Sequence, residues 1–166
     1  MMAGSVAILR LILFVGASLL AVQVAAQGTN LAFGAKPQDT SQPVEANSDE
    51  LYIDESTGTA VFTGNVVIIQ GAMRLAANRV EVIYVQEREE IDRMEATGGV
   101  TIVSGNDAAE AGAAVYNLSD QTIVMTGDVL MTQGAQVLSG EKLVIRLDEG
   151  TANMSGRVRT VLQNGD

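Results

Sequence analysis

Apolar and polar residues alternate along most of this chain. From residue 44 onward Val, Ile and Thr recur at every second position, and clusters of turn residues interrupt them repeatedly. A period of two is typical of β-strands with one buried and one solvated face, because successive side chains point to opposite sides. Patterns with the helical period are nearly absent from this region. The sequence therefore predicts an all-β, antiparallel domain.

One phrase recurs four times within this pattern. It occupies Thr63–Val66, Thr97–Val100, Thr126–Val129 and Ser155–Val158. Its glycines, at positions 64, 98, 127 and 156, are 34, 29 and 29 residues apart. Regular spacing of this size indicates a repeated unit that buries its apolar face against its neighbours. We expect each glycine to allow a bend or bulge, with ordinary turn chemistry as the alternative interpretation.

The first and third copies extend into a longer shared unit. Residues 61–72 align with residues 124–135 at a constant offset of 63. Each unit predicts a strand through the glycine phrase, a turn at Gln-Gly, and a return strand at Arg79–Val85 or Lys142–Leu147. Further turns are expected at Asp54–Gly58, Ser104–Asp107, Ser119–Gln121 and Asp148–Gly150, and a charged loop at Gln86–Glu90.

The alternation also predicts which side chains share the buried face. Positions two before, two after and four after each motif glycine form three apolar columns, and the return strands add a further set. The candidates are Phe62, Val66, Ile68, Val80, Val82, Tyr84, Val100, Ile102, Met125, Val129, Met131, Leu143, Ile145, Met154 and Val158. Two sheets with one apolar face each must pack those faces together, as a sandwich, a rolled sheet or an open barrel.

The first 26 residues differ in character from the rest. Arg10 precedes an apolar run, Leu11–Leu20, and small residues follow at Val24–Ala26. This predicts a signal peptide cleaved after Ala26. An uncleaved membrane anchor is the alternative, although the 16 residues from Leu11 to Ala26 are fewer than the roughly 20 that span a bilayer. We expect residues 27–42 to be a flexible leader, residues 43–162 the β-domain, and residues 163–166 a tail.

Charge and missing residue types exclude several functions. After cleavage the chain would carry nine basic and twenty acidic residues. This balance argues against binding nucleic acid or an anionic membrane surface. Because the chain has no His and no Cys, it lacks the commonest general base, a thiol nucleophile and any disulfide. We expect neither an enzyme nor a bound cofactor or metal, and export without disulfides is compatible with a bacterial periplasm.

Methionine is the remaining unusual feature of the predicted strands. Met73, Met94, Met125, Met131 and Met154 lie in or beside them. Methionine is flexible and adapts to irregular apolar partners. These side chains could fill gaps in an ordinary sheet core, or they could line a space that accommodates mobile hydrocarbon chains. Composition alone leaves both interpretations open.

The order of the motifs resembles the LptA/OstA family over Pro43–Val161. The resemblance is carried by Pro43–Leu51, by the four glycine phrases with Gln-Gly after two of them, and by Leu75–Val80, in which Asn78 replaces a usual Asp. It implies a β-jellyroll, slightly open along one side, that carries lipopolysaccharide through the periplasm without catalysis. The acyl chains of lipid A would lie between two sheets, against the inner-face residues given above.

The resemblance also implies partners. Protomers would join head to tail through edge strands, expected near Val44–Ile53 and Arg157–Leu162, and would bridge an LptC-like inner-membrane protein to an LptD-like outer-membrane protein. Because protein and lipid are both anionic, burial of hydrocarbon would have to dominate binding, at about 25 cal/mol per Å². The alternatives are an LptC-like anchored component of the same pathway and a structural β-repeat that binds no lipid.

Overall fold

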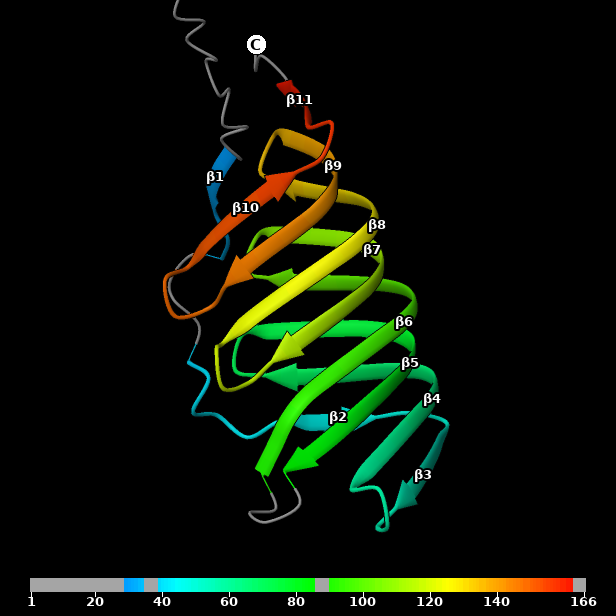
Figure 1. Ribbon diagram of the computed structural model, residues 1–166. Helices are drawn as coiled ribbons and strands as arrows, with labels where there is room; N and C mark the ends of the chain where they lie inside the picture. Colours follow the sequence, from blue (N-terminus) through cyan, green and yellow to red (C-terminus); the bar gives the residue numbers. More distant parts are fainter. Residues whose placement is uncertain (1–28, 35–38, 86–89, 163–166) are drawn as a thin grey trace, which may run out of the picture.

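The chain folds as a series of long antiparallel strands joined by tight turns (Figure 1). The computed structural model describes residues 29–34, 39–85 and 90–162. The strands are β1 (Thr29–Ala32), β2 (Glu45–Asn47), β3 (Glu50–Asp54), β4 (Thr59–Gln70), β5 (Met73–Val85), β6 (Glu90–Ser104), β7 (Asp107–Asn117), β8 (Thr122–Gln133), β9 (Gln136–Arg146), β10 (Thr151–Ser155) and β11 (Arg159–Leu162). The described residues contain no helix, so none that is long and apolar enough to cross a membrane. The all-β prediction is confirmed.

The strands belong to one open sheet with the order β1-β10-β9-β8-β7-β6-β5-β4-β2. In addition, β11 pairs with β9 and β3 pairs with β4. From β4 to β10 each strand pairs with the next one along the chain. Figure 1 shows the long strands curling over, so that the two halves of each strand face one another. The result is the predicted jellyroll-like roll, in which the two layers are halves of a single folded sheet.

The sheet folds back over itself at the repeated glycine phrase. The pairing register shifts between Thr63 and Val66 in β4, and at the corresponding places in β6 and β8. The two central residues of each phrase have positive φ, for example +76° and +46° at Gly64 and Asn65. Each shift inserts one extra residue, and such a bulge bends a strand and increases its twist. The expected bend is confirmed, and the stacked bends form what we call the corner line.

The return strands are longer than the sequence predicted. They begin at Met73 and Gln136, directly after the two-residue turns 71–72 and 134–135. The glycine of each turn has positive φ, +57° at Gly71 and +55° at Gly134, which allows the chain to reverse immediately. The first half of each return strand was therefore missed.

The N-terminal leader is only partly as expected. Instead of a flexible segment throughout, residues 29–32 form β1, which pairs with β10 so that Leu31 lies opposite Ala152. The following Phe33 is 1% exposed and belongs to the apolar core. Pairing along an open edge, burial of Phe33 and partial burial of Leu31 hold this piece in place. The predicted signal peptide, residues 27–28, most of the charged loop and the tail lie outside the described residues.

We predict that the corner line cannot accept a side chain at Gly98. Its φ is +83°, and an added Cβ would lie 2.8 Å from the Cβ of Asn78. Gly98→Ala should lower the free energy of unfolding by about 1–3 kcal/mol, measured by urea denaturation. Gly112→Ala is the matched control, since Gly112 lacks positive φ and its Cβ would meet nothing closer than 3.6 Å. Equal stability of the two variants would contradict this account of the corner.

Candidate functional site

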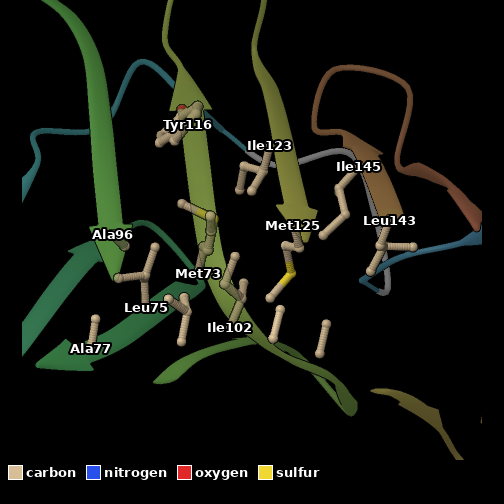
Figure 2. Packing of buried hydrophobic residues seen from close by; sticks show 14 of the residues in the cluster. Met73, Leu75, Ala77, Ala96, Ile102, Tyr116, Ile123, Met125, Leu143 and Ile145 are labelled. Atoms are coloured by element: carbon tan, nitrogen blue, oxygen red, sulfur yellow. The ribbon is translucent and has the colours of Figure 1, made fainter. Parts of the chain in front are cut away.

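The apolar interior between the two layers is the candidate site. The first layer contains the strand halves 66–77, 100–111 and 129–140, together with β2 and β11. The second layer contains the halves 59–63, 79–85, 90–97, 113–117, 122–126 and 142–146, together with β3 and β10. Figure 2 shows inner-face side chains gathered between the strands, among them Met73, Ile102, Met125 and Ile145.

Most of the predicted inner-face residues do lie in this interior. Twelve are at most 3% exposed: Val66, Ile68, Val80, Val82, Val100, Ile102, Met125, Val129, Met131, Leu143, Ile145 and Met154. Phe62 and Tyr84 are partly buried and pack against the same cluster. Val158 is the exception, because it is 38% exposed. It ends the last glycine phrase, after which only the short edge strand β11 continues. The prediction that Val158 lies in the interior is therefore wrong.

Several interior residues were missed by sequence reasoning. Strand β7 contributes Ala109, Ala111, Ala114 and Tyr116, all at most 8% exposed. Alanine is depleted in strands, so its alternation in β7 gave a weak signal. Leu75 and Leu138, both at most 2% exposed, were recognisable because they are equivalent under the 63-residue offset.

The inner face of the second layer is organised in two continuous rows. Cross-strand partners share a face, so each row can be followed through the pairing register. One row reads Leu51, Phe62, Val80, Ala96, Ala114, Met125, Leu143, Met154. The other reads Ile53, Ala60, Val82, Met94, Tyr116, Ile123, Ile145, Ala152, Leu31. The apolar surface thus runs without interruption from β3 at one end of the roll to β10 at the other, and Leu31 extends one row onto β1.

Opposite the corner line, the hairpin turns of the two layers form a second boundary that we call the mouth. The first layer contributes the turns 71–72, 105–106 and 134–135, and the second layer contributes 55–58, 118–121 and 147–150. The hydroxyl of Tyr116, in the second layer, donates a buried hydrogen bond of 2.8 Å to Oε1 of Gln70, in the first. At the mouth the two layers are therefore joined by a side-chain hydrogen bond, whereas at the corner line they are joined by continuous backbone.

The described parts of the N-terminal segment, residues 29–34 and 39–42, lie at this mouth. The first part forms hydrogen bonds to both layers. Gln133 Nε2 donates to the carbonyl of Ala32 at 3.0 Å, and Asp107 Oδ2 accepts from the amide of Gly34 at 2.8 Å. The amide of Phe33 donates to the carbonyl of Gly150, across in the second layer, at 3.0 Å. These contacts close the mouth at the β10 end of the roll.

The other described part of this segment is held by Gln70. Its Nε2 donates to the carbonyls of Thr40 and Gln42, at 2.9 and 3.1 Å, while its Oε1 accepts from Tyr116. Gln70 and Gln133 are the two glutamines of the repeated Gln-Gly phrase. The repeat therefore supplies amide groups that satisfy the backbone of the N-terminal segment, a role that the sequence pattern did not reveal.

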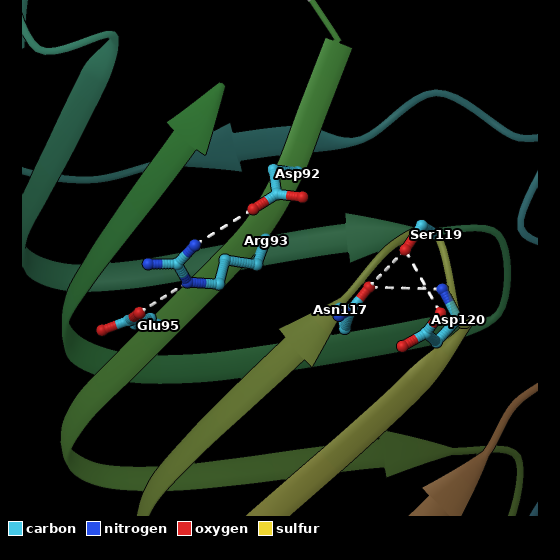
Figure 3. A network of polar contacts seen from close by, with 6 residues as sticks. All are labelled: Asp92, Arg93, Glu95, Asn117, Ser119 and Asp120. Carbon is cyan, nitrogen blue, oxygen red and sulfur yellow. Dashed lines mark hydrogen bonds and ion pairs between the residues drawn. The ribbon is translucent and has the colours of Figure 1, made fainter. Parts of the chain in front are cut away.

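Burial controls the electrostatics of this contact. Desolvation raises the pKa of Tyr116 to about 12, so its hydroxyl stays protonated at neutral pH and acts as the donor to Gln70. The ion pair of Arg93 lies on the outer face instead. Figure 3 shows Arg93 between Asp92 and Glu95, at 3.0 and 2.8 Å, near the turn that follows Asn117. Such exposed pairs contribute little to stability, about 0–1 kcal/mol each.

The described residues contain no group of acidic side chains that could hold a metal ion. What the interior offers instead is a long apolar surface between two layers, with backbone continuous on one side and a mouth on the other. Such an arrangement can enclose elongated apolar groups but holds no reactive constellation among the described residues.

Fold and interior together define an open β-jellyroll whose two layers enclose an apolar space. The same fold occurs in the crystal structure of LptH, the LptA-homologous periplasmic component of the lipopolysaccharide transport device of Pseudomonas aeruginosa. The two structures superpose with a TM-score of 0.69 at 20% sequence identity, over 77% of this chain and all of that one.

The sequence comparisons assign the family. Residues 45–151 match the family described as LptA/(LptD N-terminal domain) LPS transport protein, and the chain belongs to this family. An uncharacterised protein of Rhizobium meliloti is 34% identical over 89% of this chain and 85% of its own length. The lipopolysaccharide export system protein LptA of Escherichia coli is 29% identical over 75% of this chain and 72% of its own.

We predict that the bridge across the mouth contributes to stability. Tyr116→Phe leaves the buried Oε1 of Gln70 without its donor, which should lower the free energy of unfolding by about 1–3 kcal/mol. Tyr52→Phe is the control, because Tyr52 is 66% exposed and loss of its hydroxyl should hardly change the free energy of unfolding. Urea denaturation of the three proteins at pH 7 measures both effects.

The same pair of proteins gives a pH dependence with a defined sign. The folded-state pKa of Tyr116, about 12, lies above the value near 10 for an unfolded tyrosine. The stabilisation is therefore complete below about pH 10 and is lost as the pH rises through 12, since unfolding then releases a proton. The advantage of wild type over Tyr116→Phe should shrink across that range. A constant difference from pH 9 to 12 would contradict a buried phenol.

Proposed function

We propose that this protein carries lipopolysaccharide across the periplasm and holds its acyl chains between the two layers. The observation that carries the proposal is the family match over residues 45–151, which spans an inner face that is apolar along the whole roll. The similarity to LptA of Escherichia coli, a lipopolysaccharide export system protein, supports lipopolysaccharide as the cargo. Residues 1–26 would direct export and then be removed.

Hydrocarbon burial is the interaction that this chain can offer to such a lipid. With a formal charge of −10, the protein repels an anionic headgroup. Each buried CH₂ group of an acyl chain would contribute about 0.8 kcal/mol, so a few well-covered chains outweigh that repulsion. Five methionines are at most 2% exposed in the interior, and their flexible side chains can repack around a guest: Met73, Met94, Met125, Met131 and Met154.

The interior side chains are closed off from solvent, most of them at most 3% exposed, so lipid can reach them only if the layers separate. Every long strand continues through the corner line, which holds the layers together on that side. At the mouth they are joined by side-chain contacts such as Tyr116 to Gln70. Opening would therefore occur at the mouth. This burial from solvent is also the observation that favours the alternative of a structural β-repeat without lipid.

Bridging would use the two ends of the roll. One end presents β2 and β3, where Leu51, Tyr52 and Ile53 are 52–66% exposed. The other ends in β1, which covers β10, and in β11, near which Val158 and Val161 are 38% and 46% exposed. Apolar edge strands with unpaired backbone groups are suited to pairing with a further chain. We infer head-to-tail stacking of copies, with an LptC-like protein at one end of the bridge and an LptD-like protein at the other.

We predict that a photo-crosslinking residue in the interior captures lipopolysaccharide in cells. p-Benzoylphenylalanine at Phe62 conserves the aromatic shape at a partly buried inner position. Irradiation should give an adduct that carries lipopolysaccharide, detected by immunoblotting. The control is the same residue at Thr126, which lies exposed on the outer face.

Two results would count against the lipid interior. Equal adducts at both positions would indicate adsorption to the outer surface. No adduct at Phe62, from a folded protein recovered in the periplasmic fraction, would favour the structural β-repeat.

We predict that a charge on the β3 edge weakens self-association. Ile53→Lys places an ammonium group in an inner row of the second layer, where a neighbouring copy would cover it. The dissociation constant should rise about tenfold, or about 1.4 kcal/mol, in sedimentation velocity at increasing protein concentration. Thr126→Lys adds the same charge on the outer face and should leave association unchanged. If both variants associate like the wild type, the β3 edge is not the contact.

A further inference from the structure

The piece of chain formed by residues 29–34 occupies two places at once, and we call it the N-terminal anchor. Its strand β1 covers the outer edge of β10, with Thr29 to Ala32 opposite Met154 to Thr151. Its last two residues close the mouth, where Phe33 is 1% exposed in the core. It lies before the family match, which begins at residue 45.

The edge that β1 covers is the one a second copy would need. On its other side β10 pairs with β9, so with β1 in place it has no free edge. A strand has only two edges for backbone hydrogen bonds. Edge pairing of another chain along β10 and retention of β1 are therefore mutually exclusive.

The strand that would replace β1 is identified by the layers. At the opposite end of the roll, β3 is the edge strand of the second layer, the layer to which β10 belongs. Both β1 and β3 run from the corner line toward the mouth, since Thr29 lies opposite Met154 and Glu50 opposite Thr63 at their corner ends. In a head-to-tail stack, β3 of the next copy would meet β10 in the direction that β1 now has.

The pairing register matches these two strands residue by residue. Thr29 pairs with Met154, the last residue of the row that begins at Leu51, and Leu31 is the last residue of the row that begins at Ile53. If the rows continued into a second copy, its Leu51 and Ile53 would take the places of Thr29 and Leu31. These two side chains are 52% and 61% exposed at the free end of β3. Covering them would favour the exchange.

Removal of β1 would also open the mouth. Ala32, Phe33 and Gly34 are bonded to Gln133, Gly150 and Asp107, which belong to both layers. Because these bonds adjoin β1 directly, the anchor cannot leave β10 and keep them. Withdrawal of Phe33 would clear core volume at the side where the layers can separate.

We propose that the N-terminal anchor is an internal substitute for the β3 strand of a second copy. Docking of that copy along β10 displaces the anchor, removes Phe33 from the mouth and admits hydrocarbon chains. Assembly and opening are thereby coupled, and the isolated chain stays closed. This inference rests on the proposed function, of which it specifies the regulation.

A disulfide lock tests the coupling. Because the chain has no cysteine, the pair Ala32→Cys with Thr151→Cys has one intramolecular disulfide available. The two residues face each other beside the Phe33–Gly150 hydrogen bond, at a non-hydrogen-bonded position with the short Cα separation that a disulfide needs. The oxidised protein should remain monomeric and take up at least tenfold less fluorescent lipopolysaccharide than the reduced protein. Each single-cysteine variant is a control.

A second pair tests the exchange itself. Asp54 occupies the position in β3 that Ala32 occupies in β1. The pair Asp54→Cys with Thr151→Cys should therefore give a ladder of disulfide-linked oligomers on oxidation, whereas the first pair gives a cross-linked monomer. Because Asp54 and Thr151 belong to opposite ends of the roll, a bond between them has to join two copies.

The outcomes separate this inference from the function on which it rests. Undiminished oligomers or lipid uptake by the oxidised lock would overturn the coupling and leave the carrier function intact. Oligomers of wild type without any ladder from the second pair would overturn the exchange at β10. If the reduced proteins and wild type neither associate nor take up lipopolysaccharide, the proposed function fails, and the coupling fails with it.

Discussion

The bulge at each glycine phrase is the constraint on which the rest of the structure depends. Two successive residues with positive φ add one residue to the strand and turn it back over itself. Without that turn the sheet would expose its apolar face to water. With it, one half of every strand covers the other half, and a single sheet makes both walls of its own core. The glycine phrase recurs at its spacing because every second strand carries the bulge, and the bulges must stack at the same level.

The bend also gives the roll two unlike sides. At the corner line the layers are covalently continuous, so they cannot part there without breaking strands. At the mouth they are joined by side chains and by the N-terminal segment, through Gln70, Asp107 and Gln133. These contacts satisfy buried or half-buried polar groups at modest net stability, about 0.5–1.5 kcal/mol per hydrogen bond. The side that can open is thus determined by the fold itself.

The sequence predicted the features that depend on local pattern. Alternation identified the strands and the inner face, and the repeat identified the corners, because both follow directly from backbone geometry. Strand β7 was not recognised because most of its inner positions are alanines, which alternate without a hydrophobic contrast. Val158 was misplaced because alternation does not show that the sheet ends there.

The N-terminal anchor could not be predicted for a different reason. Its four strand residues carry no turn signal or period, and its partners lie far away in sequence, such as Gln133 for the carbonyl of Ala32. Contacts over such separations leave no local trace in a single sequence. The Gln-Gly phrase was visible as a repeat, but its two amides acquire a meaning only when the hairpin turns line up along the mouth.

An interior closed to solvent and a hydrocarbon cargo place opposite demands on one chain. An isolated protomer with open layers would expose a long apolar surface, which promotes aggregation. A protomer that stayed closed would have no room for cargo. An N-terminal anchor that leaves only when another copy covers β10 would meet both demands, because the same event removes the need for the cover and supplies a continuing wall. The two inner rows would then pass from Met154 and Ala152 of one copy to Leu51 and Ile53 of the next without an intervening polar edge.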